Sequence, residues 1–189
     1  KRETSPLLKN ISLDIKRMQS TSKELDGVLG GWIVPGSLIL LSGEPGIGKS
    51  TLALQMSEWY AEKGSNILYI SWEEHIAQIS ARAERLGVSH ENIAILTGVL
   101  FEDIVATINE SKSDIIIIDS LSVISSELIE GSPGSISQIR TMTEILMSIA
   151  KKQEKSILLI WHVTKDGTIS GPKSLEHLVD VVLFLEGVR

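Results

Sequence analysis

The chain has 189 residues, of which 42% are hydrophobic, and its formal net charge is −6 at pH 7. This size suits one globular domain with a sizeable core, and the acidic balance gives no bulk electrostatic signal for nucleic-acid binding, although a few cations in one channel could still provide it. The sequence contains no cysteine, which excludes disulfides, thiolate zinc sites and cysteine nucleophiles within these residues.

The beginning of the chain does not resemble a signal peptide. Residues 1–10 are polar, and no apolar run in the chain approaches the roughly 18–20 residues that a membrane span requires. We therefore expect a soluble, cytoplasmic protein without a membrane partner.

Strand-like and helix-like segments alternate along the chain. The expected strands are short, continuously apolar and rich in Ile, Val and Leu, as is typical of a parallel sheet buried on both faces; they cover residues 38–42, 66–71, 93–96, 114–119, 156–162 and 179–185. Helical patterns lie between them at residues 50–63, 74–86, 102–111 and 135–154, with Gly64 and Gly87 where C-caps are expected. This order predicts an α/β fold, a mainly parallel central sheet with helices on both faces.

Residues 43–50 read GEPGIGKS and fit G-x-x-x-x-G-K-[ST], the phosphate-binding P-loop. A strand-like run precedes them and a helical run follows, which is the context that the motif needs. Glycines let the backbone aim N–H groups at phosphate oxygens, Lys49 can reach the β- and γ-phosphates, and the Ser50 hydroxyl can ligate Mg²⁺. The motif predicts that a nucleoside triphosphate binds to Gly43, Glu44, Pro45, Gly46, Ile47, Gly48, Lys49, Ser50 and Thr51.

Three further groups of polar residues follow expected strands. Asp119 ends a run of four isoleucines and can hold Mg²⁺ beside Ser50, although a carboxylate can also simply end a buried strand. Glu73 and Glu74 follow the second strand and can activate the attacking water, or supply negative charge to a helix N-terminus; we favour Glu73 as the base. His162 can sense the γ-phosphate or be an ordinary polar group at a strand end, and the sequence does not decide between these.

Several segments together resemble the bacterial RadA (Sms) family of RecA-like ATPases. The resemblance runs from about Ser20 to the last residue and gives a lead-in segment at 1–19 and a RecA-like ATPase core at 20–189. It rests on ELDGVLGG at 24–31, IVPGS at 33–37, GEPGIGKST at 43–51, RAERLG at 82–87, IIIIDS at 115–120, SPGSISQIR at 132–140 and HVTKDGTISGPKSLEHLVD at 162–180.

The resemblance implies ATP as the nucleotide, with catalytic roles for Lys49, Glu73, Glu74 and His162. In the family Glu73 corresponds to the catalytic glutamate and His162 to the residue that senses the γ-phosphate. Two loops correspond to channel loops that contact single-stranded DNA, with Arg140, Lys165 and Lys173 as phosphate contacts or, alternatively, solvated surface charges. The family assembles as a hexameric ring that couples ATP hydrolysis to branch migration, with a RecA-type recombinase as partner.

The chain also departs from the family pattern. The Cys-rich zinc module, the KNRFG motif and the Lon-protease-like domain of the family are absent from these residues, so we expect an excised core or a reduced relative with slow hydrolysis. The residues Trp32, Trp72 and Trp161 stand where the family pattern has glycine. Either the gene encodes tryptophan at these positions, or it has UGA codons that the organism reads as glycine. UGG codons at all three positions would exclude recoding, and genuine indoles at 72 and 161 are expected to crowd the nucleotide site.

Two other classes of function are compatible with the motifs. One is a regulatory RecA-fold ATPase similar to KaiC, which would hydrolyse slowly without dependence on DNA. The other is a nucleotide-dependent assembly module with little catalysis. The stretch at 162–180 favours a DNA-repair ATPase over the regulatory ATPase.

Overall fold

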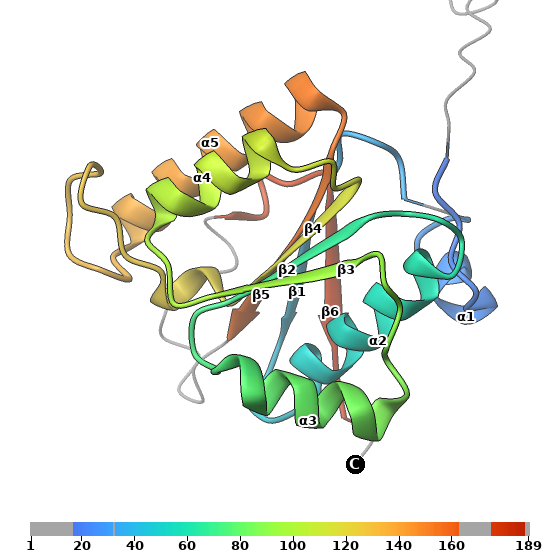
Figure 1. Ribbon diagram of the computed structural model, residues 1–189. Helices are drawn as coiled ribbons and strands as arrows, with labels where there is room; N and C mark the ends of the chain where they lie inside the picture. The colour runs from blue at the N-terminus through green and yellow to red at the C-terminus, as the bar shows by residue number, and fades with distance from the viewer. Residues whose placement is uncertain (1–16, 32, 163–174, 188–189) are drawn as a thin grey trace, which may run out of the picture.

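The computed structural model describes residues 17–31, 33–162 and 175–187. These residues form one six-stranded sheet of order β3-β2-β4-β5-β1-β6 in which every neighbouring pair is parallel (Figure 1). The strands are β1 (Leu38–Gly43), β2 (Ile67–Ser71), β3 (Ile93–Thr97), β4 (Ile115–Asp119), β5 (Ser156–His162) and β6 (Val181–Leu185). The predicted α/β class, a RecA-like parallel sheet, is confirmed.

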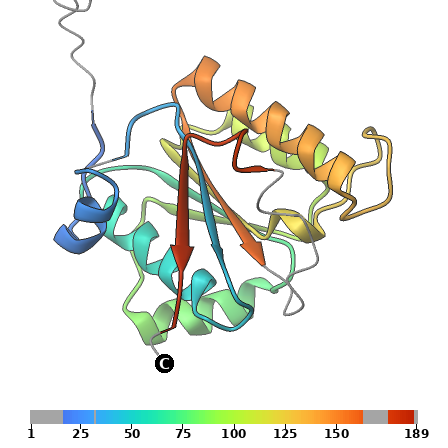
Figure 2. The ribbon, with the colours of Figure 1, turned by 180° about the vertical axis from the view of Figure 1, so that it is seen from behind.

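Helices cover both faces of the sheet. They are α1 (Lys23–Val28), α2 (Lys49–Ala61), α3 (Ile76–Leu86), α4 (Phe101–Glu110), α5 (Ile136–Gln153) and the short 3-10 helix η2 (Leu121–Val123). Helices α4 and α5 lie on one face, and α2 and α3 lie on the other (Figure 1). Seen from behind, β6, β1 and β5 run side by side (Figure 2).

Strand β4 shows why the predicted strands are apolar throughout. Its side chains alternate between two core clusters: Ile116 and Ile118 pack with α4 and α5, whereas Ile115 and Ile117 pack with α2 and α3. Both faces of the strand are therefore buried, and neither needs polar residues.

Two helices differ from the sequence prediction, whereas both predicted helix-ending glycines are confirmed. Helix α1 was not expected because six residues with one buried side chain, Leu25, give no helical periodicity; the Ser22 side chain caps it by accepting from Leu25 N. Helix α3 begins at Ile76 rather than at residue 74, since Glu74 N donates to Ser71 Oγ before the helix begins. Gly87 and Gly64 both end their helices in the left-handed conformation, as predicted: Gly87 caps α3, and after α2 Gly64 donates to Ala61 O while Ser65 donates to Tyr60 O.

No helix in the described ranges is both long and apolar enough to be a candidate membrane span.

Two of the three unusual tryptophans can be placed, and Trp32 lies outside the described residues. Trp161 is 4% exposed within β5 and belongs to the core cluster under α4 and α5, and the partly buried Trp72 packs against the same cluster. The Trp161 indole N–H finds no hydrogen-bond partner among the described residues. The ring therefore contributes apolar packing at the cost of an unpaired donor, and whether the gene encodes tryptophan here stays a prediction.

The packing of Trp161 predicts a large loss of stability when the ring is removed. Trp161→Ala is expected to lower the free energy of unfolding by about 3–5 kcal/mol, because it leaves a cavity in the core. Denaturant unfolding measures this, with Val28→Ala, at a side chain 67% exposed, as the surface control. A loss below about 1 kcal/mol would mean that the ring is not packed as described.

Candidate active site

The predicted site residues meet at the carboxyl edge of the sheet, where open α/β sheets bind ligands. Strand β1 runs into the P-loop at Gly43, which pairs in register with His162 at the end of β5. Strand β4 ends at Asp119, in register with Ser71, and Ser71 leads through Trp72 to Glu73. Polar residues from segments far apart in the sequence therefore lie together at the carboxyl edge of the sheet.

The P-loop backbone is shaped to receive phosphate. A Cβ at Gly43 would lie 2.6 Å from the Leu185 carbonyl oxygen of β6, so only glycine fits between these strands. Gly48 has φ +107° at the N-cap of α2 and provides no side-chain cap. Among the described residues the backbone amides of Gly46, Gly48 and Lys49 donate no hydrogen bond, which leaves them free at a helix N-terminus.

Lys49 lies inside this loop and is 2% exposed. Its Nζ donates to the carbonyl oxygens of Gly43 at 2.7 Å and Glu44 at 2.8 Å. Burial lowers the pKa of Lys49, while the charges of Asp119 and Glu73 act in the opposite direction. The ammonium is therefore held by weak neutral acceptors, which phosphate oxygens can replace with stronger charge-assisted bonds.

Ser50 and Asp119 offer oxygen ligands of the kind that Mg²⁺ prefers. Ser50 lies in the first turn of α2, and Asp119 is 6% exposed with Oδ2 accepting from Tyr69 Oη at 2.7 Å. Burial and Asp119 raise the pKa of Tyr69 well above its usual range, so the phenol remains a donor. The described residues contain no cluster of three or more His, Cys, Asp or Glu that could cage a metal. This donor set fits Mg²⁺ that is held by one or two side chains together with nucleotide phosphates and water.

The two adjacent glutamates have different surroundings. Glu73 Oε1 accepts from Ser120 Oγ at 3.0 Å and lies 4.0 Å from His162 Nε2. Both Glu74 oxygens accept from the Arg82 guanidinium, at 3.0 and 2.6 Å. The structure thus brings Glu73 to the site and engages Glu74 in an ion pair with α3.

One cavity of about 530 Å³ joins these parts. It is lined by P-loop, strand-tip and η2 residues and by the beginning of α5, among them Pro45, Gly46, Glu73, Ser122, Gly134, Trp161 and His162. The predicted base, the predicted phosphate sensor and the P-loop tip therefore share one space. Trp161 forms part of its wall, whereas Trp72 is not among its lining residues, and crowding of a nucleotide by either indole stays a prediction.

His162 lines this cavity, and its surroundings shift the pKa of its imidazole. Burial and the charge of Lys49 lower its pKa below the ordinary value of 6.5, although Glu73 and Asp119 oppose the shift. The imidazole is therefore largely neutral at pH 7 and available as a hydrogen-bonding group.

This shift predicts a pH effect on stability. Below about pH 6.5 an unfolded chain protonates at this residue before the folded chain does, so the free energy of unfolding should fall as the pH drops from 7 to 5. His162→Gln lacks this contribution, so the stability of the wild type relative to the variant should decrease over that range. Urea unfolding of both proteins at several pH values measures it, and a constant or increasing difference would contradict the assignment.

The predicted DNA contacts are only partly placed. Arg140 lies on α5, 61% exposed, and pairs with Glu144 at 3.1 Å. Lys165 and Lys173 lie outside the described residues. The contact of all three with DNA stays a prediction.

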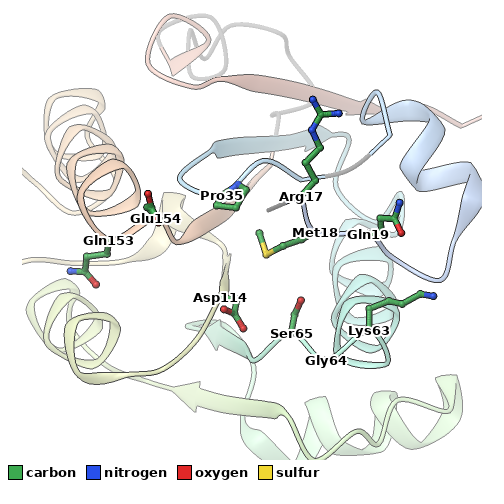
Figure 3. Close-up of a pocket in the computed structure, with 10 residues that line it drawn as sticks. All are labelled: Arg17, Met18, Gln19, Pro35, Lys63, Gly64, Ser65, Asp114, Gln153 and Glu154. Atoms are coloured by element: carbon green, nitrogen blue, oxygen red, sulfur yellow. The ribbon is translucent and has the colours of Figure 1, made fainter. Parts of the chain in front are cut away.

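A second large cavity, of about 470 Å³, lies at the opposite edge of the sheet (Figure 3). Its walls come from segments at the amino ends of strands: Pro35 precedes β1, Asp114 precedes β4, and Lys63 and Glu154 follow α2 and α5. It contains no P-loop residue and is not part of the site.

Sequence reasoning did not single out Ser120, Tyr69 or Arg82. Tyr69 and Arg82 looked like an ordinary strand residue and an ordinary helix-surface residue, and only the packing of β2, β4 and α3 gives them partners at the site. Ser120 directly follows Asp119 and ends the segment IIIIDS, and these were the available signals.

Comparison with known proteins gives a consistent picture. The sequence profile of the AAA domain family matches residues 2–168. The DNA repair protein RadA of Chlamydia muridarum is 48% identical over 171 residues, which cover 90% of this chain and 38% of that protein. The RadA proteins of Listeria monocytogenes and Bacillus subtilis are 44% and 41% identical, over 99% and 98% of this chain and 41% and 40% of their own lengths. The chain thus spans about two fifths of these curated relatives.

Proposed function

The chain belongs to the AAA domain family and, over its P-loop core, to the bacterial RadA family; on this premise we propose that residues 20–189 are an ATPase core that acts in DNA repair. The observation that carries the proposal is the cavity shared by the P-loop tip, Glu73 and His162. Free backbone donors, a buried lysine and an acidic group at one sheet edge are what phosphoryl transfer to water requires.

In the proposed reaction ATP lies along the P-loop, with its β- and γ-phosphates against the amides of Gly46 and Gly48 and the Lys49 ammonium. Mg²⁺, held by Ser50 and Asp119, would supply charge neutralisation between these phosphates. Glu73 takes a proton from a water molecule while the water oxygen bonds to the γ-phosphorus and the bond from that phosphorus to the β-phosphate oxygen breaks. His162, as a neutral imidazole, contacts the γ-phosphate side and reports whether it is present.

We further propose that the core binds single-stranded DNA and couples ATP hydrolysis to branch migration. The relatives are DNA repair proteins by name, which supports this proposal. Arg140, Lys165 and Lys173 are the proposed phosphate contacts, in a hexameric ring that cooperates with a RecA-type recombinase. With a net charge of −6 for the chain, such contacts must act locally.

A regulatory ATPase without DNA dependence is the second candidate, and one observation favours it. Before α5 the loop presents exposed Glu127 and Glu130, and Arg140 is already paired with Glu144. The described residues of that loop therefore offer no surplus positive charge for DNA phosphates.

Fluorescence anisotropy of labelled single-stranded DNA separates the two candidates. The titration is made at two salt concentrations, with and without a non-hydrolysable ATP analogue, and Arg140→Ala is compared with Lys152→Ala, an exposed lysine at the other end of α5. Salt-sensitive binding that needs the analogue and weakens in Arg140→Ala alone supports the DNA proposal. No binding in any condition favours the regulatory ATPase.

A further inference from the structure

Ser120 connects the proposed base to the rest of the site. The side chain is fully buried, and its Oγ lies 3.0 Å from Glu73 Oε1 and 2.9 Å from Ser122 Oγ. A carboxylate can only accept, so the Ser120 hydroxyl donates to Glu73. The one proton of Ser120 is then used, and the Ser122 hydroxyl must donate to Ser120.

Ser122, the last residue of this chain of hydroxyl groups, has its backbone close to Gly134. A Cβ on Gly134 would lie 3.0 Å from the Ser122 carbonyl oxygen, so the loop before α5 approaches Ser122 where Gly134 has no side chain. Ser122, Gly134 and Glu73 also line the same cavity. The position of Ser122, and through it that of Ser120, therefore depends on where this loop lies.

The loop itself is anchored to two helices. From α5, the buried Gln138 donates through Nε2 to the carbonyl oxygens of Ile129 at 3.0 Å and Gly131 at 3.3 Å. From α4, Glu102 accepts from Leu128 N at 3.2 Å. These bonds tie the loop to α4 and α5 next to the point where it approaches Ser122.

We propose that Ser120 is a positioning residue for the ATPase reaction, and that it fixes the Glu73 carboxylate through Oε1 so that Oε2 takes the proton of the attacking water. Among the described residues Oε2 of Glu73 accepts no hydrogen bond, which leaves it available. Ser120 keeps its own proton throughout: one proton moves from water to Oε2, and the water oxygen bonds to phosphorus as the bond to the leaving ADP breaks. This role rests on the proposed function.

The test is a comparison of Ser120→Ala with Ser57→Ala in the full chain. Ser57 is also a buried serine, but within the part of the chain that the structure describes its hydroxyl bonds inside α2, to Ala53 O, so it controls for the loss of a buried hydroxyl. Turnover at saturating MgATP and the Kd of a fluorescent non-hydrolysable ATP analogue are measured for both. Ser120→Ala is expected to lower kcat by about tenfold to a hundredfold, as fits one hydrogen bond to a charged group, and to change Kd less than about twofold. Ser57→Ala should change neither.

A double-mutant cycle distinguishes positioning from a structural effect. In the Glu73→Gln background, Ser120→Ala should cause at most a small further loss of turnover, because no carboxylate remains to be oriented. An equal further loss there, or unchanged kcat in the single variant, overturns the role of Ser120 while the ATPase function stands. A wild-type chain that binds the analogue but releases no phosphate overturns the ATPase function and this role together.

Discussion

Replacing Lys49 with alanine is expected to reduce turnover of MgATP by about two to three orders of magnitude and to weaken nucleotide affinity. The ammonium is buried at the end of the P-loop, and among the described residues it donates to two carbonyl oxygens, so phosphates would be stronger partners. The fold should survive, because removing a buried charge also removes its desolvation cost. Phosphate release and titration with a fluorescent ATP analogue measure the two effects.

Lys63→Ala is the matched control for this experiment. Lys63 is exposed just after the other end of α2 and lines the cavity at the opposite edge of the sheet. We expect wild-type affinity and turnover from it. If the Lys49 variant bound and hydrolysed ATP like the control, the P-loop assignment would be wrong.

Glu73→Gln is expected to lower kcat by about two to four orders of magnitude while nucleotide affinity changes only a few-fold. The amide keeps the size of the side chain and can still accept from Ser120 through its carbonyl oxygen, but it cannot take a proton from water. Single-turnover phosphate release, measured beside binding of the analogue, separates the chemical step from affinity.

Glu74→Gln provides the neighbouring control. Its carboxylate is engaged by the Arg82 guanidinium through two bonds, so the variant should lose about 1 kcal/mol of stability or less and keep turnover within a few-fold. The reverse pattern, with turnover lost in Glu74→Gln and kept in Glu73→Gln, would move the base to Glu74.

The sheet and the P-loop could be predicted because they depend on local patterns. Strands such as β4 are buried on both faces and read as unbroken apolar runs, and the carboxyl ends of parallel strands must share one edge. That rule alone places Asp119, Glu73 and His162 near the P-loop before any side chain is seen.

The difference between Glu73 and Glu74 depends on long-range packing. Glu73 accepts from Ser120 because β2 pairs with β4, which places the ends of the two strands side by side. Glu74 accepts from Arg82 because α3 begins at Ile76 and its second turn lies next to the end of β2. Neither partner is implied by the residues next to the glutamates. Helix α1 could not be predicted for a similar reason, since a single buried leucine leaves no periodicity to detect.

The most direct measurement is Mg²⁺-dependent phosphate release from ATP by the wild-type chain, compared with Glu73→Gln at equal occupancy by nucleotide. Our account predicts release by the wild type that disappears on chelation of Mg²⁺ and falls by at least about a hundredfold in the variant. Equal release by both proteins, or no release by a wild-type chain saturated with MgATP, would contradict it.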